Sequence, residues 1–252
     1  MRSKYLAGVV VGALTLGGAM AAWAVPASQT TLDVTFKPGS PEAGTKKKPR
    51  ANSLKISIKG DTTTGSGQPA TSTALNIMLP KQWRLNSERW PRRARCDIAE
   101  ANQGKSDSVC PRGSKIGAGS AIVQGGASEQ GAGVTRTLFV RAYVIENGDL
   151  GFFVQNKRGE TPAVALMIQG NTSRRRRISI KIPQNLQEPV AGVPTGIRLL
   201  EFTLRGKARA GGKRLGIVDT TGCGSRKQWL FTLQDVYRDG KKSDSDTARC
   251  RR

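Results

Sequence analysis

The residues of this chain that could do chemistry are limited, because the sequence contains no histidine. Ser-His-Asp and Cys-His catalytic sets and imidazole metal sites are therefore excluded. A Ser-Lys pair would need only Ser114 and Lys115, but adjacent residues of a strand point to opposite faces, and the S-x-x-K spacing is absent. The surrounding glycines, Gly113–Gly119, lack the spacing of a phosphate-binding loop. We predict no catalytic residue and no enzyme.

Carboxylates are the remaining candidates for catalysis or metal binding. A glycosidase needs only two of them, and the chain has 18 acidic residues, but nothing in the sequence pairs two. Asp244 and Asp246, in the run S-D-S-D-T, lack the other ligands of a calcium loop. A zinc site would need a C-x-x-C pair or histidine, and neither is present. We keep a carboxylate-based glycosidase as the weakest alternative and predict no metal and no cofactor.

Basic residues are the main candidates for binding. The densest run is Arg174, Arg175, Arg176 and Arg177, and a second run comprises Lys46, Lys47, Lys48 and Arg50. Arginine forks suit phosphate, sulfate or carboxylate groups, so both runs are candidate anion-binding sites. The alternatives are that the arginines protect a sheet edge and that the lysines lie in a solvated loop.

The N-terminus predicts export. Arg2 and Lys4 precede an apolar run, Leu6–Met20, and Ala22-Trp23-Ala24 is typical of a signal-peptidase site. We predict a signal peptide over residues 1–24 and a single exported domain over residues 25–252, soluble after cleavage and either secreted or held at the cell surface. Without a further apolar segment, no membrane span is expected in the mature chain.

Export determines how the cysteines are interpreted. Four of them, Cys96, Cys110, Cys223 and Cys250, form an even set in an oxidising compartment, where disulfides persist. They allow three pairings. Pairing each cysteine with its neighbour, Cys96 with Cys110 and Cys223 with Cys250, closes the shortest loops and is the one we predict.

The net charge suggests the class of partner. Cleavage removes Arg2 and Lys4, so the mature chain carries +21, two less than the +23 of the full sequence. A protein this basic is attracted to polyanions such as teichoic or uronic-acid polymers, or to anionic lipid head groups. The alternative is that the charge only keeps the protein soluble. Aromatic residues are 5% of the chain, too few for base-stacking platforms, and no specific nucleic-acid motif is present.

Alternating apolar residues predict the elements that position these groups. Strands are expected around Thr31–Phe36, Leu54–Ile58, Leu75–Leu79, Val134–Ile145 and Leu150–Gln155, among others. Asn147-Gly148 predicts a hairpin turn, and the Gly/Ser/Thr-rich connection after Ile58 suggests another hairpin, joining the second and third of these strands. With ten or more short strands and little helix, the pattern predicts an all-β antiparallel sandwich, immunoglobulin-like or jelly-roll-like.

A tryptophan-containing segment and a short loop complete the pattern. Trp83 and Trp90 lie among basic residues and could form an aromatic binding surface, but we expect them to plug one end of the sandwich. Asp97–Gln103 is expected to form a helical turn inside the Cys96–Cys110 loop.

The order of several motifs resembles a group of uncharacterised secreted proteins of actinobacteria. The motifs are A-G-T-K-K-K-P-R, L-P-K-Q-W-R-L-N, C-P-R-G-S-K-I-G-A-G-S-A and T-G-C-G-S-R-K-Q-W with a closing cysteine. The resemblance covers most of the mature chain, and C-P-x-x-S-K-I-G-x-G is its most specific part. It implies export, disulfides and a β-rich fold, and it assigns no site.

Together these features predict a non-catalytic exported protein of the cell envelope or extracellular space that binds an anionic polymer or surface through basic loops. The main alternative is a structural or protein-interaction module of the cell surface with no ligand of its own.

Overall fold

The protein consists mainly of β-strands. A computed structural model describes residues 26–62, 69–125, 134–160, 163–190, 193–224 and 226–251. The predicted signal peptide lies outside these residues. The described strands are β1 (Thr30–Pro38), β2 (Arg50–Asn52), β3 (Leu54–Thr62), β4 (Ser72–Met78), β5 (Trp83–Leu85), β6 (Lys115–Gly125), β7 (Val134–Val144), β8 (Leu150–Asn156), β9 (Ala165–Ser173), β10 (Arg177–Lys181), β11 (Thr195–Leu204), β12 (Lys207–Ala210), β13 (Lys213–Gly216), β14 (Val218–Thr220), β15 (Gln228–Tyr237) and β16 (Lys241–Arg249). The all-β class is confirmed.

The helices are short. They are α1 (Ile98–Gln103), α2 (Gln184–Gln187) and the 3-10 segments η1 (Ala27–Gln29), η2 (Ser87–Arg89), η3 (Arg92–Ala94) and η4 (Arg112–Ser114). Asp97 caps α1, because its carboxylate accepts hydrogen bonds from the amides of Ala99 and Glu100. The expected helical turn is confirmed. Nowhere in the described ranges does a helix have the length and apolar character needed to cross a bilayer.

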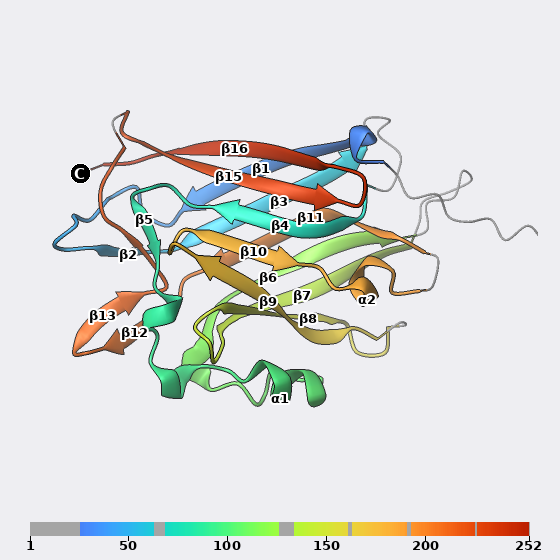
Figure 1. Ribbon diagram of the computed structural model, residues 1–252, viewed down its shortest axis with the longest axis horizontal. Helices are drawn as coiled ribbons and strands as arrows, with labels where there is room; N and C mark the ends of the chain where they lie inside the picture. The colour runs from blue at the N-terminus through green and yellow to red at the C-terminus, as the bar shows by residue number, and fades with distance from the viewer. Residues whose placement is uncertain are drawn as a thin grey trace, which may run out of the picture.

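Eleven strands form one antiparallel sheet in the order β1-β3-β11-β6-β7-β8-β9-β10-β4-β15-β16. The sheet curls until its two edge strands, β1 and β16, lie side by side, which gives a nearly closed, flattened barrel (Figure 1). The sandwich prediction therefore needs correction, because the interior is enclosed by one continuous sheet. The expected hairpin between β3 and β4 is also wrong. β3 pairs with β1 and β11, whereas β4 pairs with β10 and β15.

Side chains of β16 close the barrel where no backbone ladder joins its edges. Asp244 accepts a hydrogen bond from the Val34 amide at 2.8 Å, and Asp246 accepts one from the Phe36 amide at 2.7 Å. At the start of the same strand, the ammonium of Lys242 donates to the carbonyl of Thr30. These residues occupy every second position of β16, so they share one side of the strand. We call this contact the seam.

Strands that follow one another along the chain run in opposite directions in the barrel, so the connections between them alternate between its two ends. The capped end, at the left of Figure 1, carries the connections 39–53, 79–114, 145–149, 174–176 and 205–227. The other end, at the right, is where β3, β6, β8, β10 and β15 finish, and we call it the open end. A three-stranded sheet, β2-β14-β5, lies at the capped end and gives it its name.

The core fills the capped half of the barrel with large side chains. Trp83 and Trp229 are fully buried and meet edge to face, with ring centroids 5.2 Å apart. Trp90 is also buried, and its indole donates to the carbonyl of Gly113. The predicted plug of tryptophans is confirmed, since burying such large apolar rings is strongly favourable. The indole of Trp229 also donates, to the carbonyl of Gly222 at 3.0 Å, whereas the buried N–H of Trp83 has no partner among the described residues.

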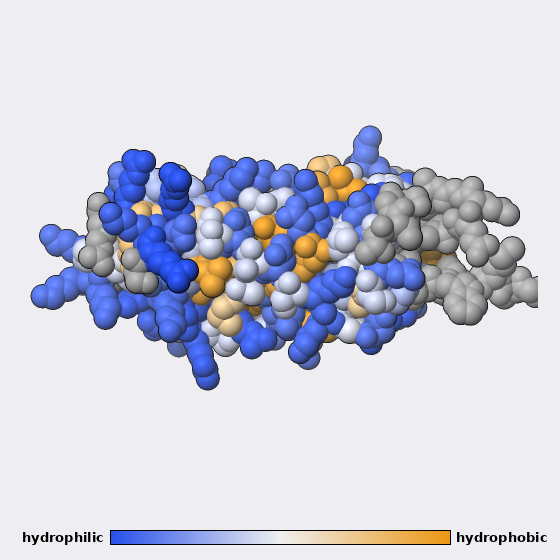
Figure 2. All heavy atoms as spheres, turned by 90° about the horizontal axis from the view of Figure 1, so that it is seen from above, coloured by the Kyte–Doolittle hydropathy of each residue, from blue (hydrophilic) through white to orange (hydrophobic). Residues whose placement is uncertain are grey.

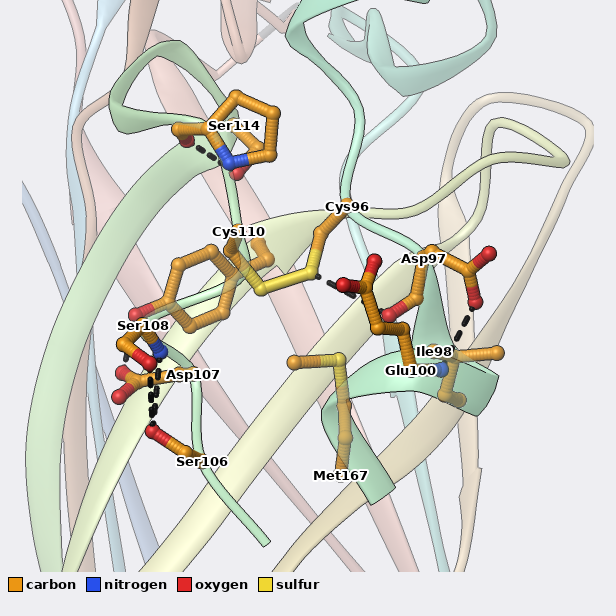
Figure 3. The surroundings of a disulfide bond; sticks show 12 residues. Cys96, Asp97, Ile98, Glu100, Ser106, Asp107, Ser108, Cys110, Ser114 and Met167 are labelled. Atoms are coloured by element: carbon orange, nitrogen blue, oxygen red, sulfur yellow. Dashed lines mark hydrogen bonds between the residues drawn. A yellow bond between two sulfur atoms is a disulfide. The ribbon is translucent and has the colours of Figure 1, made fainter. Parts of the chain in front are cut away.

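A second, smaller core lies on the outer face of β7, β8 and β9. Tyr143, Phe153 and Met167 point outward from these strands and are covered by the loop that Cys96 and Cys110 close. β8 is consequently buried on both faces. Figure 3 shows the disulfide above Met167, with Asp97 beside the start of α1. Both predicted disulfides are confirmed, the second joining Cys223 to Cys250.

Candidate anion-binding surface

Three residues of the predicted arginine run, Arg174–Arg176, form the turn between β9 and β10, and Arg177 begins β10. Arg174 and Arg175 have positive φ values, 50° and 54°, which place both in the left-handed region. Two backbone hydrogen bonds hold the turn against the cap: the Leu85 amide donates to the Arg175 carbonyl at 2.7 Å, and the Leu79 amide donates to the Arg176 carbonyl at 2.8 Å. The turn therefore lies against the end of β5, and its side chains are displayed from a fixed backbone.

Three of the four arginine side chains of this run illustrate how their partners differ. Arg174 is exposed and pairs with no carboxylate among the described residues. Arg175 lies 3.5 Å from the carboxylate of Glu88, in an ion pair that is about half exposed on both sides. Arg177 donates to the Asn76 side chain at 3.3 Å. A guanidinium with no carboxylate partner remains available to an external anion.

The predicted lysine run lies at the opposite edge of the cap. Lys46, Lys47 and Lys48 are exposed in the connection that leads into β2. Arg50 differs, because it forms an ion pair with Glu42 and its charge is locally compensated. β14 lies between β2 and β5, so two strand spacings of about 4.8 Å, or roughly 10 Å, separate β2 from the strand against which the arginine turn lies. The structure thus places both predicted runs on the same end of the barrel, as two patches separated by the width of the cap.

The hairpin of β12 and β13 adds basic residues that the sequence had not singled out. It projects from the capped end and turns at Gly211 and Gly212, whose positive φ values of 56° and 74° suit glycine (Figure 1). Arg209 and Arg214 are exposed and directly opposite each other in the register. Like charges placed this way repel and destabilise the pair, and a bound anion would relieve the repulsion.

Asp219, the acidic residue of the β2-β14-β5 sheet, has a buried side chain. Asp219 is buried, and its carboxylate accepts hydrogen bonds from the Asn86 amide group at 2.8 Å and from the Gly216 amide at 3.3 Å. Burial raises the pKa of Asp219, although these hydrogen bonds and the charges of Arg89 and Arg84 act in the opposite direction. A buried carboxyl with satisfied partners does little to offset the positive charge of the outer surface.

The capped end and the open end of the barrel differ in net charge. The connection 205–227 carries seven basic residues and one acidic residue, and the connection 79–114 carries eight and four. At the open end, the connection 157–164 has two basic residues and one acidic residue, and 182–194 has only Glu188. Figure 2 shows strongly hydrophilic side chains crowded over the capped end, at its left. Sequence reasoning found the two runs but missed this segregation, because it depends on which connections share an end.

The residues around the first disulfide have structural contacts. The Ser114 hydroxyl is buried and donates to the carbonyl of Pro111 at 2.6 Å, so it is not held by Lys115. Among the described residues, no three cysteine, aspartate or glutamate side chains gather as a metal site would require. Comparison with protein-family models, with curated proteins and with solved structures finds no match.

Proposed function

We propose that this protein is exported and non-catalytic, and that it holds an anionic polymer or an anionic surface against its capped end. The observation that carries the proposal is the segregation of charge: exposed cations from three separate connections share one end of the barrel. Opposite charge gathered on one face raises the local concentration of a polyanion and the rate of its association. The signal-like N-terminus and the two disulfides support an extracellular location.

Two pairs of cations are the principal contacts in this proposal. One is Arg174 with Arg175 in the β9–β10 turn, and the other is Arg209 with Arg214 on the β12–β13 hairpin. Guanidinium groups fit phosphate and carboxylate oxygens with two parallel hydrogen bonds, so teichoic and uronic-acid polymers and anionic lipid head groups share the required chemistry.

Binding measured across a salt series tests the proposal. Teichoic acid, polygalacturonate and vesicles containing phosphatidylglycerol are the probes. The variants are R174N/R175N, in which asparagine tolerates the left-handed backbone, and R209S/R214S. The matched control is K157S/R158S, which removes two exposed cations from the open end. We expect each capped-end variant to weaken binding and to reduce the slope of log K against log salt, while the control changes neither by a comparable amount.

Two results would overturn the proposal. Equal weakening by all three variants would show that only total charge matters. Surface association that all three variants leave unchanged would favour the second candidate, a structural or protein-interaction module whose charge only keeps it soluble.

A further inference from the structure

A cavity of about 410 Å³ occupies the interior of the barrel at the open end. Its volume is within the range of about 300–1,000 Å³ that small-molecule pockets occupy. The cavity is partly open to the outside, as a binding pocket is, and is not an enclosed packing defect of the interior. The cavity lies at the opposite end from the tryptophan plug and shares no residue with the cationic pairs of the capped end.

Apolar side chains on the inner face of the sheet form most of the wall. They come from facing strands and include Ala121 on β6, Val140 on β7, Val154 on β8, Ile180 on β10 and Leu200 on β11. Alternation explains their orientation, because each belongs to the inward row of its strand. The capped half is filled by three tryptophans, whereas this half is lined mainly by aliphatic side chains, together with Phe152 and Phe202, whose rings meet edge to face with centroids 5.7 Å apart. The sheet therefore encloses an apolar space.

One arginine stands among these apolar residues. Arg136 is two residues from Leu138 and four from Val140, so β7 places it on the same inward row, near the beginning of the strand at the open end. Among the residues that the structure describes, it is the one charged residue lining the cavity, and it is exposed at the cavity's open end. Its guanidinium donates to the carbonyl of Thr135 at 3.3 Å, and it has no ion pair with a described carboxylate.

The neutral polar groups beside the cavity are already engaged. The Thr195 hydroxyl donates to the carbonyl of Leu186 at 2.6 Å, and the Gln187 side-chain amide donates to the carbonyl of Ile182 at 2.6 Å. The Ser72 hydroxyl donates to Asp235 at 2.9 Å. Arg136 is thus the lining group best placed to receive a polar part of a ligand.

We propose that this cavity binds a single-chain amphiphile with an anionic head group, a fatty-acid-like molecule. Its hydrocarbon chain lies along the apolar wall, and its carboxylate or phosphate pairs with Arg136 at the open end. Burial of the chain supplies the affinity because apolar surface leaves water, and the guanidinium selects the charge of the head group. The site is separate from the capped end, so it does not depend on the proposed polyanion binding.

Displacement of a fluorescent fatty acid from the delipidated full-length mature chain tests the proposal. The competitors share a sixteen-carbon chain: palmitate, a monoacyl phosphate, the neutral alcohol and the trimethylammonium cation. We expect the two anions to bind at least about tenfold more tightly than the cation, which corresponds to one charge-assisted contact. Comparing palmitate with the monoacyl phosphate then distinguishes a carboxylate from a phosphate ligand.

Variants separate the chain site from the head-group site. R136Q should weaken binding of both anions about tenfold and leave the neutral alcohol unchanged, whereas R158Q, an exposed arginine of the same end, should change neither. Ala121→Phe fills the cavity and should abolish binding of every competitor. Val123→Phe, at a half-buried lining position, is the second filling variant in case the first does not fold, as near-ultraviolet circular dichroism would show.

Three outcomes would overturn the inference. They are no displacement by any competitor, equal affinity for the anionic and cationic chains, and full binding by a folded cavity-filling variant. Loss of polyanion binding in the capped-end variants with retention of fatty-acid binding would show that the two sites are independent, as we infer.

Discussion

Arg141 on β7 donates hydrogen bonds from one guanidinium nitrogen to both carboxylate oxygens of Asp107, at 2.7 and 2.6 Å. Asp107 belongs to the loop closed by Cys96 and Cys110, and the hydroxyl of Tyr143 donates to the same carboxylate. The disulfide loop is therefore fastened to the outer face of the barrel by a polar contact as well as by its apolar residues. Burial alone would raise the pKa of Asp107, but the hydrogen bonds from Tyr143 and Arg141 and the charge of Arg141 outweigh it and lower that pKa.

The first prediction concerns this contact. A lowered pKa means that the folded state binds the proton less tightly than the unfolded state, so the contribution is complete above about pH 4 and is lost as pH falls below it. We expect Asp107→Asn to reduce the free energy of unfolding at pH 7 by about 1–2 kcal/mol, a modest value because the pair is partly exposed. Chemical denaturation between pH 2 and pH 7 measures the difference, which should shrink at the acidic limit. A double-mutant cycle with Arg141→Gln checks that the loss belongs to this pair.

The second prediction concerns a buried carboxyl inside the barrel. Asp235 on β15 is 4% exposed, and burial raises its pKa to about 7, although a hydrogen bond from Ser72 acts against the shift. The folded state keeps a proton that the unfolded chain releases near pH 3.8, so stability falls as pH rises from about 4 to about 7 and then levels off.

Asp235→Asn should remove this pH dependence. The amide retains an acceptor for Ser72 and cannot ionise, so we expect the variant to be more stable than the natural protein at pH 8 by roughly 2–4 kcal/mol and nearly equal to it at pH 4. Thermal unfolding across this pH range gives the comparison. Parallel stability curves for the two proteins would contradict the assignment.

The third prediction concerns the seam. Removing the carboxylates with D244A/D246A leaves the amides of Val34 and Phe36 without their acceptors. We expect a loss of roughly 2–4 kcal/mol in the free energy of unfolding, because each is a charge-assisted hydrogen bond. Hydrogen exchange at these two amides should accelerate more than exchange within the β6–β7 ladder. The control is S243A/S245A, at the alternate exposed positions of β16, which should change exchange at neither amide.

The fourth prediction compares the two disulfides. Cys223–Cys250 closes a separation of 27 residues and Cys96–Cys110 one of 14, so chain entropy predicts about 3–4 kcal/mol for the first and about 3 kcal/mol for the second. We expect paired alanine substitutions to have different local effects. C223A/C250A should speed hydrogen exchange in β16, whereas C96A/C110A should speed it in α1. Peptide mapping without reductant checks the pairing, and a crossed pairing would contradict it.

Sequence patterns identified the parts of this fold that depend on local alternation. Leu54, Ile56 and Ile58 point inward as expected, and Asn147-Gly148 forms the β7–β8 turn with Gly148 at a φ of 86°. β16 was missed because its side chains, K-K-S-D-S-D-T-A-R, contain no apolar alternation and it packs no large residue into the core. It is a strand because β15 pairs with it and β1 meets its carboxylates, and both causes lie in tertiary structure.

The candidate sites were predictable to different degrees. Composition alone identifies the two basic runs, Arg174–Arg177 and Lys46–Arg50. It does not reveal that Arg50 pairs with Glu42. The cavity could not be found from sequence, because Ala121, Val140 and Leu200 look like ordinary core residues until the curl of the sheet brings them around one space. Arg136 becomes notable only when the residues around it are known to face inward.

The seam also determines the order in which the barrel can be completed. It joins residues 210 positions apart, so β1 leaves the ribosome long before the carboxylates that will bind its amides exist. Until Lys241–Arg249 arrives, the amides of Val34 and Phe36 lack those acceptors and lie on an exposed edge that other chains could pair with. A chain truncated before β16 would keep most of its core and yet remain at risk of aggregation. The polar strand β16 therefore protects the edge of β1 from pairing with other chains.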